Sequence, residues 1–228
     1  MLFDNFSFVD LTHPLSSTIP TWDNSCGFKL NIGTENDEIV MSTSSGTHID
    51  APSHFFERKC SVDLLPLKQL LVPVCVIDVS QKAHAHYALS VQDIQTYENV
   101  WGKITENCIV LGYTGWSRYW DDPKAYRNMD DEGNMHYPFF SMEAIEYLLA
   151  RNIAGIAIDS FSPESIKVSQ TSYPLHERLL KAEKYIIENL ANGHLLPPKG
   201  AYILALPLKI QKGGEAPARV IGLIQKEA

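Results

Sequence analysis

Short apolar runs separated by turn-forming residues dominate this chain, and most of them have the length of a strand. Residues 72–79 form a nearly continuous β-branched run, which indicates a central strand buried on both faces. Residues 108–112, 155–159 and 185–188 have the same apolar character, and the last two runs end in a carboxylate. Shorter strands are predicted at residues 8–11, 28–32, 38–42, 201–206 and 219–225.

Three segments have a helical pattern instead. Residues 90–97 begin with Ser90, a good N-cap, and place apolar side chains on one face. Helices are also predicted from Ser141 to about residue 151 and over residues 175–184. About eight or nine short strands with three helices, several of them joined by hairpin-length connections, favour an α/β fold with a mixed sheet. No break in composition suggests a boundary, so one domain over residues 1–228 is expected.

Composition narrows the classes of partner. The formal charge of −8 and a pI near 5.4 argue against nucleic acid. No apolar run reaches the roughly 18 residues of a membrane span, and residues 1–5 lack the basic region of a secretory signal. The four cysteines have wide, irregular spacing, which is typical of buried reduced thiols rather than of disulfides. A cytoplasmic globular protein is therefore expected.

The segment Gly46-Thr47-His48-Ile49-Asp50-Ala51-Pro52-Ser53-His54-Phe55 concentrates the candidate chemistry. If this loop is extended around His48 and Asp50, their side chains point to the same side, as two ligands of one metal must. Pro52 then stiffens the turn and sets His54 at a defined offset, where it could transfer protons without being a ligand. A lone histidine is more often an ordinary polar loop residue, but this cluster favours a site.

A second patch lies downstream, at Asp159, His176 and Glu188. Glu188 ends an apolar run, and a buried carboxylate there is costly unless it is paired or bound to a metal. The alternatives are a solvated strand end for Glu188 and an exposed helix cap for His176. Neither residue decides the question alone.

Residues 46–55 resemble the signature of the cyclase-like metal-dependent hydrolases, a family that includes bacterial kynurenine formamidases and isatin hydrolases. The resemblance extends over nearly the whole chain. It includes the segments Asp10–Leu15, Pro20–Trp22, Thr114–Trp116, Gly155–Asp159 and Ile187–Leu190.

The resemblance implies a swivelling β/β/α-type fold, assembly as a homodimer or larger homo-oligomer, and a divalent metal, zinc or manganese. Carried over by matching motif, the metal ligands are His48, Asp50, His176 and Glu188. By the same matching, His54 is the catalytic histidine and Trp22 packs on an aromatic substrate.

One position departs from the formamidase pattern. Ser44 stands where that motif begins with a metal-binding histidine, and neither Thr43 nor Ser45 restores a ligand. A serine hydroxyl is a much poorer zinc ligand than imidazole. One metal instead of two, a preference for a harder ion such as manganese, or an abandoned site could follow.

The sequence therefore predicts hydrolysis of an amide or formamide bond in a small aromatic substrate, with kynurenine formamidase activity first. The alternatives are an isatin hydrolase-like cyclic amidase and an inactive, metal-poor descendant that binds a ligand or partner. Trp116, Tyr119 and Trp120 could line the pocket or be ordinary core or surface aromatics.

Overall fold

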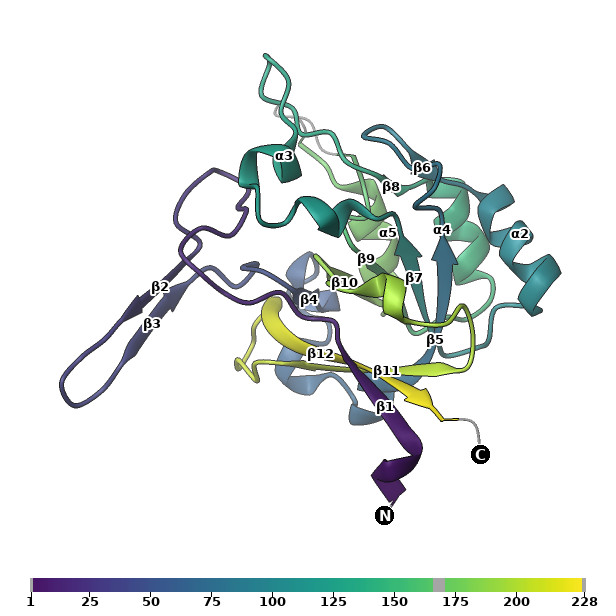
Figure 1. The fold of residues 1–228 in the computed structure, drawn as a ribbon, viewed down its shortest axis with the longest axis horizontal. Coiled ribbons are helices and arrows are strands. Elements are labelled where there is room, and N and C mark those ends of the chain that lie inside the picture. Colours follow the sequence, from purple (N-terminus) through teal and green to yellow (C-terminus); the bar gives the residue numbers. More distant parts are fainter. Residues whose placement is uncertain (1, 166–170, 227–228) are drawn as a thin grey trace.

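The computed structural model describes residues 2–165 and 171–226, and its main feature is a sheet that closes on itself (Figure 1). The strands of this sheet are β1 (Phe6–Asp10), β4 (His48–Asp50), β5 (Leu71–Asp78), β7 (Ile109–Tyr113), β9 (Gly155–Ile158), β10 (Tyr185–Glu188), β11 (Ala201–Pro207) and β12 (Glu215–Gln225). Two small pairs stand apart, β2 (Phe28–Asn31) with β3 (Glu38–Met41) and β6 (Ala88–Leu89) with β8 (Phe139–Phe140).

The order around the ring is β12-β11-β5-β7-β9-β10-β4, and β4 pairs back onto β12. β1 lies outside the ring, along the free edge of β12. The neighbours β5, β7, β9 and β10 are parallel, whereas β4, β11 and β12 join their neighbours in antiparallel fashion. This is a mixed, barrel-like sheet in an α/β domain, as the sequence predicts.

Helices cover the outer face of the parallel strands (Figure 1). The α-helices are α1 (Leu67–Leu70), α2 (Val91–Trp101), α3 (Pro123–Arg127), α4 (Met142–Leu149) and α5 (Pro174–Lys181). Short 3₁₀ turns are η1 (Leu2–Asn5), η2 (Pro52–His54), η3 (Val62–Leu64), η4 (Trp116–Tyr119) and η5 (Gly193–Leu195).

Two hydrophobic cores follow from the alternation along the strands. On β5, Val74 and Val76 point into the ring, while Cys75 and Ile77 point toward the helices. The inner core is closed by β-branched and small side chains from every ring strand, and the outer core by the apolar stripes of α2, α4 and α5. A continuous apolar run is what a strand buried on both faces requires, which explains why these strands are visible in the sequence.

Local signals set the helix starts. Ser90 caps α2 with a complete capping box, in which the Asp93 side chain accepts a hydrogen bond from the Ser90 backbone N–H. Ser141 caps α4 by accepting from Ala144 N–H at 3.1 Å. α5 begins with Pro174, which needs no hydrogen-bond partner in the first turn.

Some predictions about secondary structure were wrong. β4 lies within a segment predicted as loop, because a three-residue strand has no detectable periodicity and is defined by its partners on both sides. α3, β6 and β8 were missed, and the polar segment over residues 126–137 begins and ends in buried tyrosines, Tyr126 and Tyr137. Cys26 is exposed, against the expectation of buried thiols, although all four cysteines are free.

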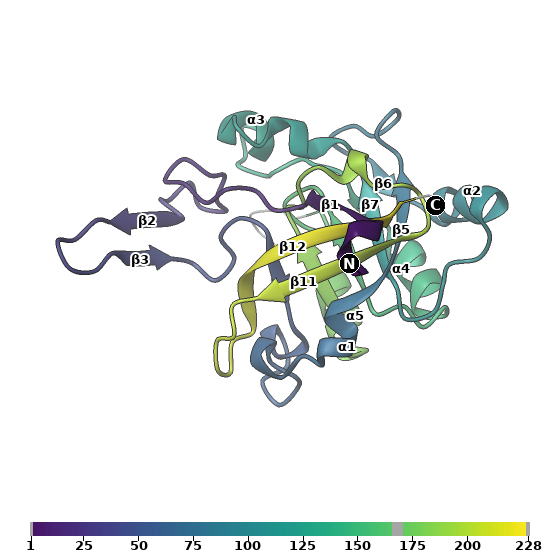
Figure 2. The same cartoon turned by 60° about the horizontal axis from the view of Figure 1, so that its bottom comes forward.

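The β2–β3 hairpin projects away from the body of the molecule (Figure 2). The register pairs Leu30 with Ile39, and both side chains are at least half exposed. Among the described residues, no helix is long and apolar enough to cross a membrane.

Candidate metal centre

β4 places two of the predicted ligands at the centre of the site, because it lies between β10 and β12. His48 and Asp50 are two residues apart on this strand, so their side chains share one face. Across the β10 pairing, His48 is directly opposite Glu188. Opposed residues of an antiparallel pair have their Cβ atoms roughly 4.5–5.5 Å apart on the same face. The short β4 strand therefore brings an imidazole and two carboxylates together.

α5 supplies the second imidazole from its first turn. His176 is 6% exposed, and its Nδ1 lies 2.5 Å from Glu164 Oε1. The Glu164 carboxylate also accepts the backbone N–H groups of Leu175 and His176, at 3.3 and 3.1 Å. A carboxylate at a helix N-terminus satisfies free N–H groups and complements the helix dipole. Glu164 thus fixes both the start of α5 and the ring of His176.

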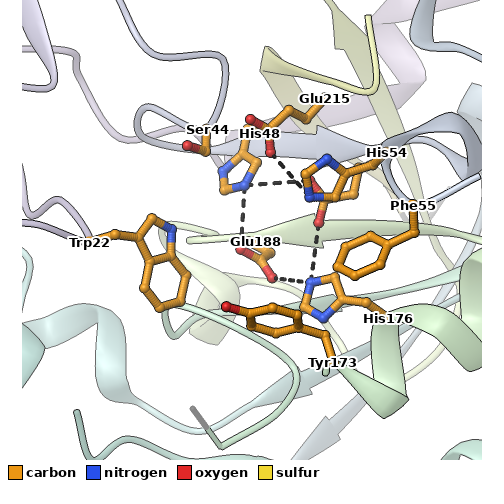
Figure 3. A pocket seen from close by; sticks show the side chains of 10 residues that line it. Trp22, Ser44, His48, His54, Phe55, Tyr173, His176, Glu188 and Glu215 are labelled. Atoms are coloured by element: carbon orange, nitrogen blue, oxygen red, sulfur yellow. Dashed lines mark hydrogen bonds and ion pairs between the residues drawn. The ribbon is translucent and has the colours of Figure 1, made fainter. Parts of the chain in front are cut away.

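The two imidazoles present their Nε2 atoms to the same carboxylates (Figure 3). His48 Nε2 lies 3.3 Å from Glu188 Oε2 and 3.6 Å from Asp50 Oδ1. His176 Nε2 lies 3.2 Å from Glu188 Oε1 and 3.5 Å from Asp50 Oδ2. All four side chains converge on one point at the base of a cavity.

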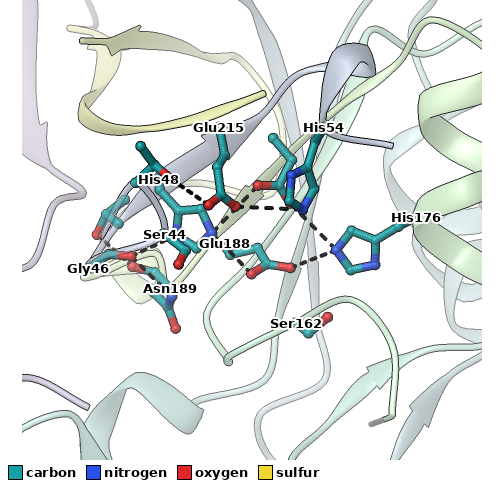
Figure 4. A network of polar contacts seen from close by, with 12 residues as sticks. Ser44, Gly46, His48, His54, Ser162, His176, Glu188, Asn189 and Glu215 are labelled. Carbon is teal, nitrogen blue, oxygen red and sulfur yellow. Dashed lines mark hydrogen bonds and ion pairs between the residues drawn. The ribbon is translucent and has the colours of Figure 1, made fainter. Parts of the chain in front are cut away.

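A polar network behind the centre holds the ring of His48 (Figure 4). The carbonyl of Gly46 accepts from His48 Nδ1 at 2.9 Å and from Asn189 Nδ2 at 3.1 Å. Gly46 has a φ of +67°, and a Cβ there would approach the Leu15 side chain, so a residue with a side chain would be strained at this position. With Nδ1 donating to this carbonyl, Nε2 of His48 is the atom that can bind a metal.

Charge in this pocket is unbalanced. Burial alone lowers the pKa of His48, but the hydrogen bond that the ring donates to Glu188 and the charges of Asp50 and Glu188 outweigh it and raise that pKa to about 9. Burial opposes protonation of His176 too, yet contacts with Asp50, Glu164 and Glu188 raise its pKa well above the usual value. Burial raises the pKa of the Asp50 carboxyl, and the surrounding histidines lower it further than burial raises it. The buried carboxylates of this pocket therefore favour the binding of positive charge.

The residues fit a divalent metal. Asp50 is only 1% exposed, and its buried Oδ1 has no hydrogen-bond partner among the described residues. Such an atom is costly unless something binds it. Two groups have ligand atoms within 4.8 Å of one another: Asp50 with His176 and Glu188, and Asp50 with His48 and Glu215. Imidazole and carboxylate ligands suit zinc and manganese alike.

Aromatic side chains line the rest of the cavity, which has a volume of about 450 Å³ (Figure 3). Trp22 stands on one side and packs against Phe161, with ring centroids 4.9 Å apart. Phe55 and Tyr173 stand on the other side, and Phe55 stacks on His176 at 5.5 Å. His54 is about one-third exposed at the wall. An aromatic group of a small molecule would be bordered by apolar rings and have its polar end at the carboxylates.

The structure brings every residue of the predicted site to this cavity: Trp22, His48, Asp50, His54, His176 and Glu188. Their roles as ligands, proton-transfer group and substrate platform stay predictions. Glu188 is not a solvated strand end and His176 is not an exposed helix cap, because both residues are buried. These two alternatives from the sequence were wrong.

Other candidates lie elsewhere. Asp159 is fully buried and accepts hydrogen bonds from the backbone and hydroxyl of Thr114, at 2.8 and 2.7 Å, so it holds the loop after β7. Trp116 and Trp120 pack with Tyr126 in an aromatic cluster and do not line the cavity.

Three residues of the site were missed from the sequence. Glu164, Tyr173 and Glu215 lie in segments without a recognisable motif, and only the fold brings Tyr173 and Glu215 to the cavity and Glu164 to the ring of His176. The alternation on β12 could have placed Glu215 on one face, but not opposite Asp50.

Comparisons with known proteins point to the same family as the segment of residues 46–55 does. The model of the Cyclase family matches residues 9–165. The isatin hydrolase of Roseibium aggregatum is 33% identical over 196 residues, which are 82% of this chain and 74% of that protein. The kynurenine formamidase of Geobacillus thermodenitrificans is 29% identical over 222 residues, 93% of this chain and 95% of the relative.

Solved structures agree too. Isatin hydrolase A from Labrenzia aggregata bound to benzyl benzoate has a TM-score of 0.89 at 31% identity, covering 99% of this chain and 96% of that one. A potential metal-dependent hydrolase with cyclase activity has a TM-score of 0.76 at 27% identity, covering 97% and 100%. The chain belongs to the cyclase family of metal-dependent hydrolases.

Proposed function

We propose that this protein hydrolyses an amide or formamide bond in a small aromatic substrate, with a divalent metal, zinc or manganese, held by His48, Asp50, His176 and Glu188. The observation that carries the proposal is the convergence of two imidazole Nε2 atoms on Asp50 and Glu188 at the base of a cavity bordered by aromatic rings. When bound, such an ion supplies Lewis acidity at a carbonyl and lowers the pKa of water.

The protein's own residues have three tasks in this proposal. Gly46 and Glu164 hold the two histidines by their Nδ1 atoms, so that each ring keeps its orientation. Trp22 packs on the aromatic part of the substrate and directs the scissile bond to the carboxylates. His54, whose Nε2 faces the cavity wall near Glu215, transfers a proton from the attacking water to the leaving nitrogen.

Kynurenine formamidase activity is the first candidate, because formamidases match over 95–96% of their own length and 93–94% of this chain. A cyclic amidase of the isatin hydrolase type is the second. The 33% identity to an isatin hydrolase and the TM-score of 0.89 favour it. The two reactions differ in the fate of the cleaved carbonyl, which leaves as formate from a formamide and stays in the product as a carboxylate when a ring is opened.

One experiment tests the family of reactions and its members together. Protein purified without chelator is analysed for bound metals and then assayed on N-formylkynurenine, isatin and a panel of simple formamides and cyclic imides. We expect bound or bindable divalent metal and turnover of at least one aromatic substrate, lost after chelation and restored by metal. Tight ligand binding without any turnover would instead support the inactive descendant, which the replacement at Ser44 suggests.

We also propose that two or more copies of the chain assemble, in the cytoplasm, as a homodimer or larger homo-oligomer. The support is the β2–β3 hairpin, whose Leu30, Ile32, Ile39 and Val40 side chains are 50–81% exposed. Exposed apolar side chains gathered on a projecting hairpin are typical of an interaction surface. Light scattering should give a monomer mass for Leu30→Ser/Ile39→Ser if this hairpin joins the copies, and an unchanged mass would contradict it.

A further inference from the structure

Glu215 occupies a position that no sequence motif marks. It is the first residue of β12, and the register sets it directly opposite Asp50 on β4. The two strands are held tightly at this point, because the backbone N–H of Ala51 donates to the carbonyl of Gly214 at 2.8 Å. β4 thus has an acidic partner on each side, Glu188 from β10 and Glu215 from β12.

The carboxylate of Glu215 is aimed into the cavity (Figure 4). Its Oε1 accepts a hydrogen bond from the Thr43 hydroxyl at 2.7 Å, and its Oε2 lies 3.6 Å from His54 Nε2. The Glu215 side chain is 18% exposed. One of its oxygens lies within 4.8 Å of ligand atoms of both His48 and Asp50.

Ser44 lines the same cavity, yet its hydroxyl is engaged with Ser42 Oγ at 3.1 Å. A neutral hydroxyl at this position is a much poorer metal ligand than the imidazole of a histidine. We propose that Glu215 replaces the missing histidine and is the third protein ligand, with His48 and Asp50, of a first metal position beside a second one formed by Asp50, His176 and Glu188. This inference rests on the proposed metal-dependent function, and it states that the chain binds two ions despite Ser44.

The unpartnered oxygen of Asp50 supports this arrangement. Asp50 belongs to both groups of ligands, so each of its two oxygens can serve a different ion. Its Oδ2 lies 3.5 Å from His176 Nε2, whereas its Oδ1 lies 3.6 Å from His48 Nε2 and has no hydrogen-bond partner among the described residues. A single ion at the second group would leave this buried oxygen unsatisfied.

An alternative role for Glu215 is to orient His54 as a proton-transfer group, since Glu215 Oε2 lies 3.6 Å from His54 Nε2. That role predicts a change in turnover and in its pH profile, with metal binding untouched. The ligand role predicts a change in metal binding that persists when His54 is absent.

The donor set also predicts which ion is preferred. A position built from one imidazole and two carboxylates is richer in oxygen than one with two imidazoles, and oxygen ligands favour manganese over zinc. Returning a histidine to position 44 while neutralising Glu215 should therefore shift the preference at this position toward zinc.

Metal binding is measured directly by calorimetric titration of the metal-free protein with Mn²⁺ and by the visible spectrum with Co²⁺. Wild type is expected to bind two ions per chain. Glu215→Gln can still accept the hydrogen bond from Thr43. It should lower the affinity for one of the two ions by at least about tenfold. Glu215→Gln/Ser44→His should restore metal binding at the first position, with a relative gain in affinity for Zn²⁺ and an altered Co²⁺ spectrum. Glu57→Gln, an exposed glutamate outside the cavity, is the matched control.

The outcomes separate the inference from the function on which it rests. Wild type with no bindable metal would overturn the proposed function and the inference together. One ion in wild type, bound equally by Glu215→Gln, would overturn the inference alone. Unchanged metal binding with a shifted pH profile would assign Glu215 to His54. Repeating the titration in His54→Ala settles the same point, and thermal melts of each variant confirm folding.

Discussion

Two regions of this protein bury histidine, and they treat it in opposite ways. His48 is 1% exposed and His13 is 9% exposed, so both rings are removed from water. His13 stacks on Trp120 with ring centroids 4.0 Å apart and planes only 11° from parallel. Burial in these surroundings lowers the pKa of His13 to about 4, against a weaker opposing hydrogen bond with the Leu190 backbone. In the metal centre, carboxylates overcome burial and raise the pKa of His48 to about 9.

The difference shows that burial alone does not make a functional histidine. Desolvation disfavours the charged ring in both regions, and only nearby carboxylates reverse the sign. A set of carboxylates that attracts a proton to imidazole also attracts a divalent cation. The aromatic surroundings of His13 offer no such charge, and among the described residues its Nε2 has no hydrogen-bond partner. The backbone N–H of His13 donates to Thr47 Oγ1 at 3.0 Å, beside the metal centre.

The largest effect should follow from removing the carboxylate that both metal groups share. Asp50→Ala is expected to remove most of the bound metal and to reduce turnover to background, because each group loses a ligand. The loss should exceed the roughly 10–100-fold that follows from disturbing only a metal's outer partners. Elemental analysis and turnover are compared with Asp121→Ala, an exposed aspartate outside the cavity. Full metal content in Asp50→Ala would show that the ion binds elsewhere.

His54 should have the next largest effect, on rate rather than on binding. His54→Ala is expected to lower turnover about 10²–10⁴-fold, the usual cost of losing a positioned general acid or base. Metal content should stay at the wild-type level, because His54 belongs to neither group of candidate ligands. Metal analysis and kinetics on the same sample check both halves. A variant emptied of metal would place His54 among the ligands.

How far the sequence predicts this centre depends on how local each signal is. His48 and Asp50 are two residues apart beside a glycine and a proline, so their shared direction can be inferred without a structure. The strands β5, β7, β9 and β10 were predicted because burial on both faces requires continuous apolar runs. β4 could not be predicted, since its strand geometry comes from pairing with β10 and β12.

Acidic residues of the centre show the same limit. Glu188 ends a buried apolar run, which made it a candidate, and its role as a ligand was predicted only from the resemblance to the family. Glu164 and Glu215 stand in polar or glycine-rich surroundings, where a glutamate is ordinary in the sequence. Only the N-terminus of α5 and the register of β12 give them their positions. Contacts that depend on tertiary register leave no trace in a single sequence.

The pKa of His13 predicts a pH-dependent stability that sharpens the comparison. The unfolded chain binds a proton at His13 with a pKa near 6.5, whereas the folded chain binds it only near 4. Unfolded protein therefore binds more protons in this window, and stability is lost as the pH falls from 6.5 toward 4. His13→Phe, which keeps a ring against Trp120 but cannot titrate, should lack about 3 kcal/mol of that loss.

Urea unfolding of the metal-free wild type and of His13→Phe at several pH values checks this. Titration of the metal-centre residues is common to both proteins, so the difference between them isolates His13. Parallel curves from pH 7 to pH 4 would show that His13 is protonated in the folded state as readily as in the unfolded one.

The smallest of these effects should come from Glu164, which acts on the metal centre through His176. Glu164→Gln keeps the size of the side chain but replaces the charged acceptor at Nδ1 of His176 and at the N-terminus of α5. Loss of such an outer partner typically costs about 10–100-fold in metal affinity, because the ring becomes a weaker and less well oriented ligand. Among the described residues no carboxylate holds the ring of His13, so that region has no position at which an equivalent substitution could be made.

Calorimetric titration with Mn²⁺ measures the affinity, and Glu177→Gln, on the exposed side of the same helix turn, is the matched control. A loss of helix stability without a loss of metal affinity would show that Glu164 serves only as a cap of α5. Loss of affinity in Glu164→Gln at unchanged melting temperature would instead show that the carboxylate acts through His176. That second result would complete the contrast between the two regions. In the metal centre, carboxylates lie beside both ring nitrogens of His176, whereas the ring of His13 stacks on Trp120.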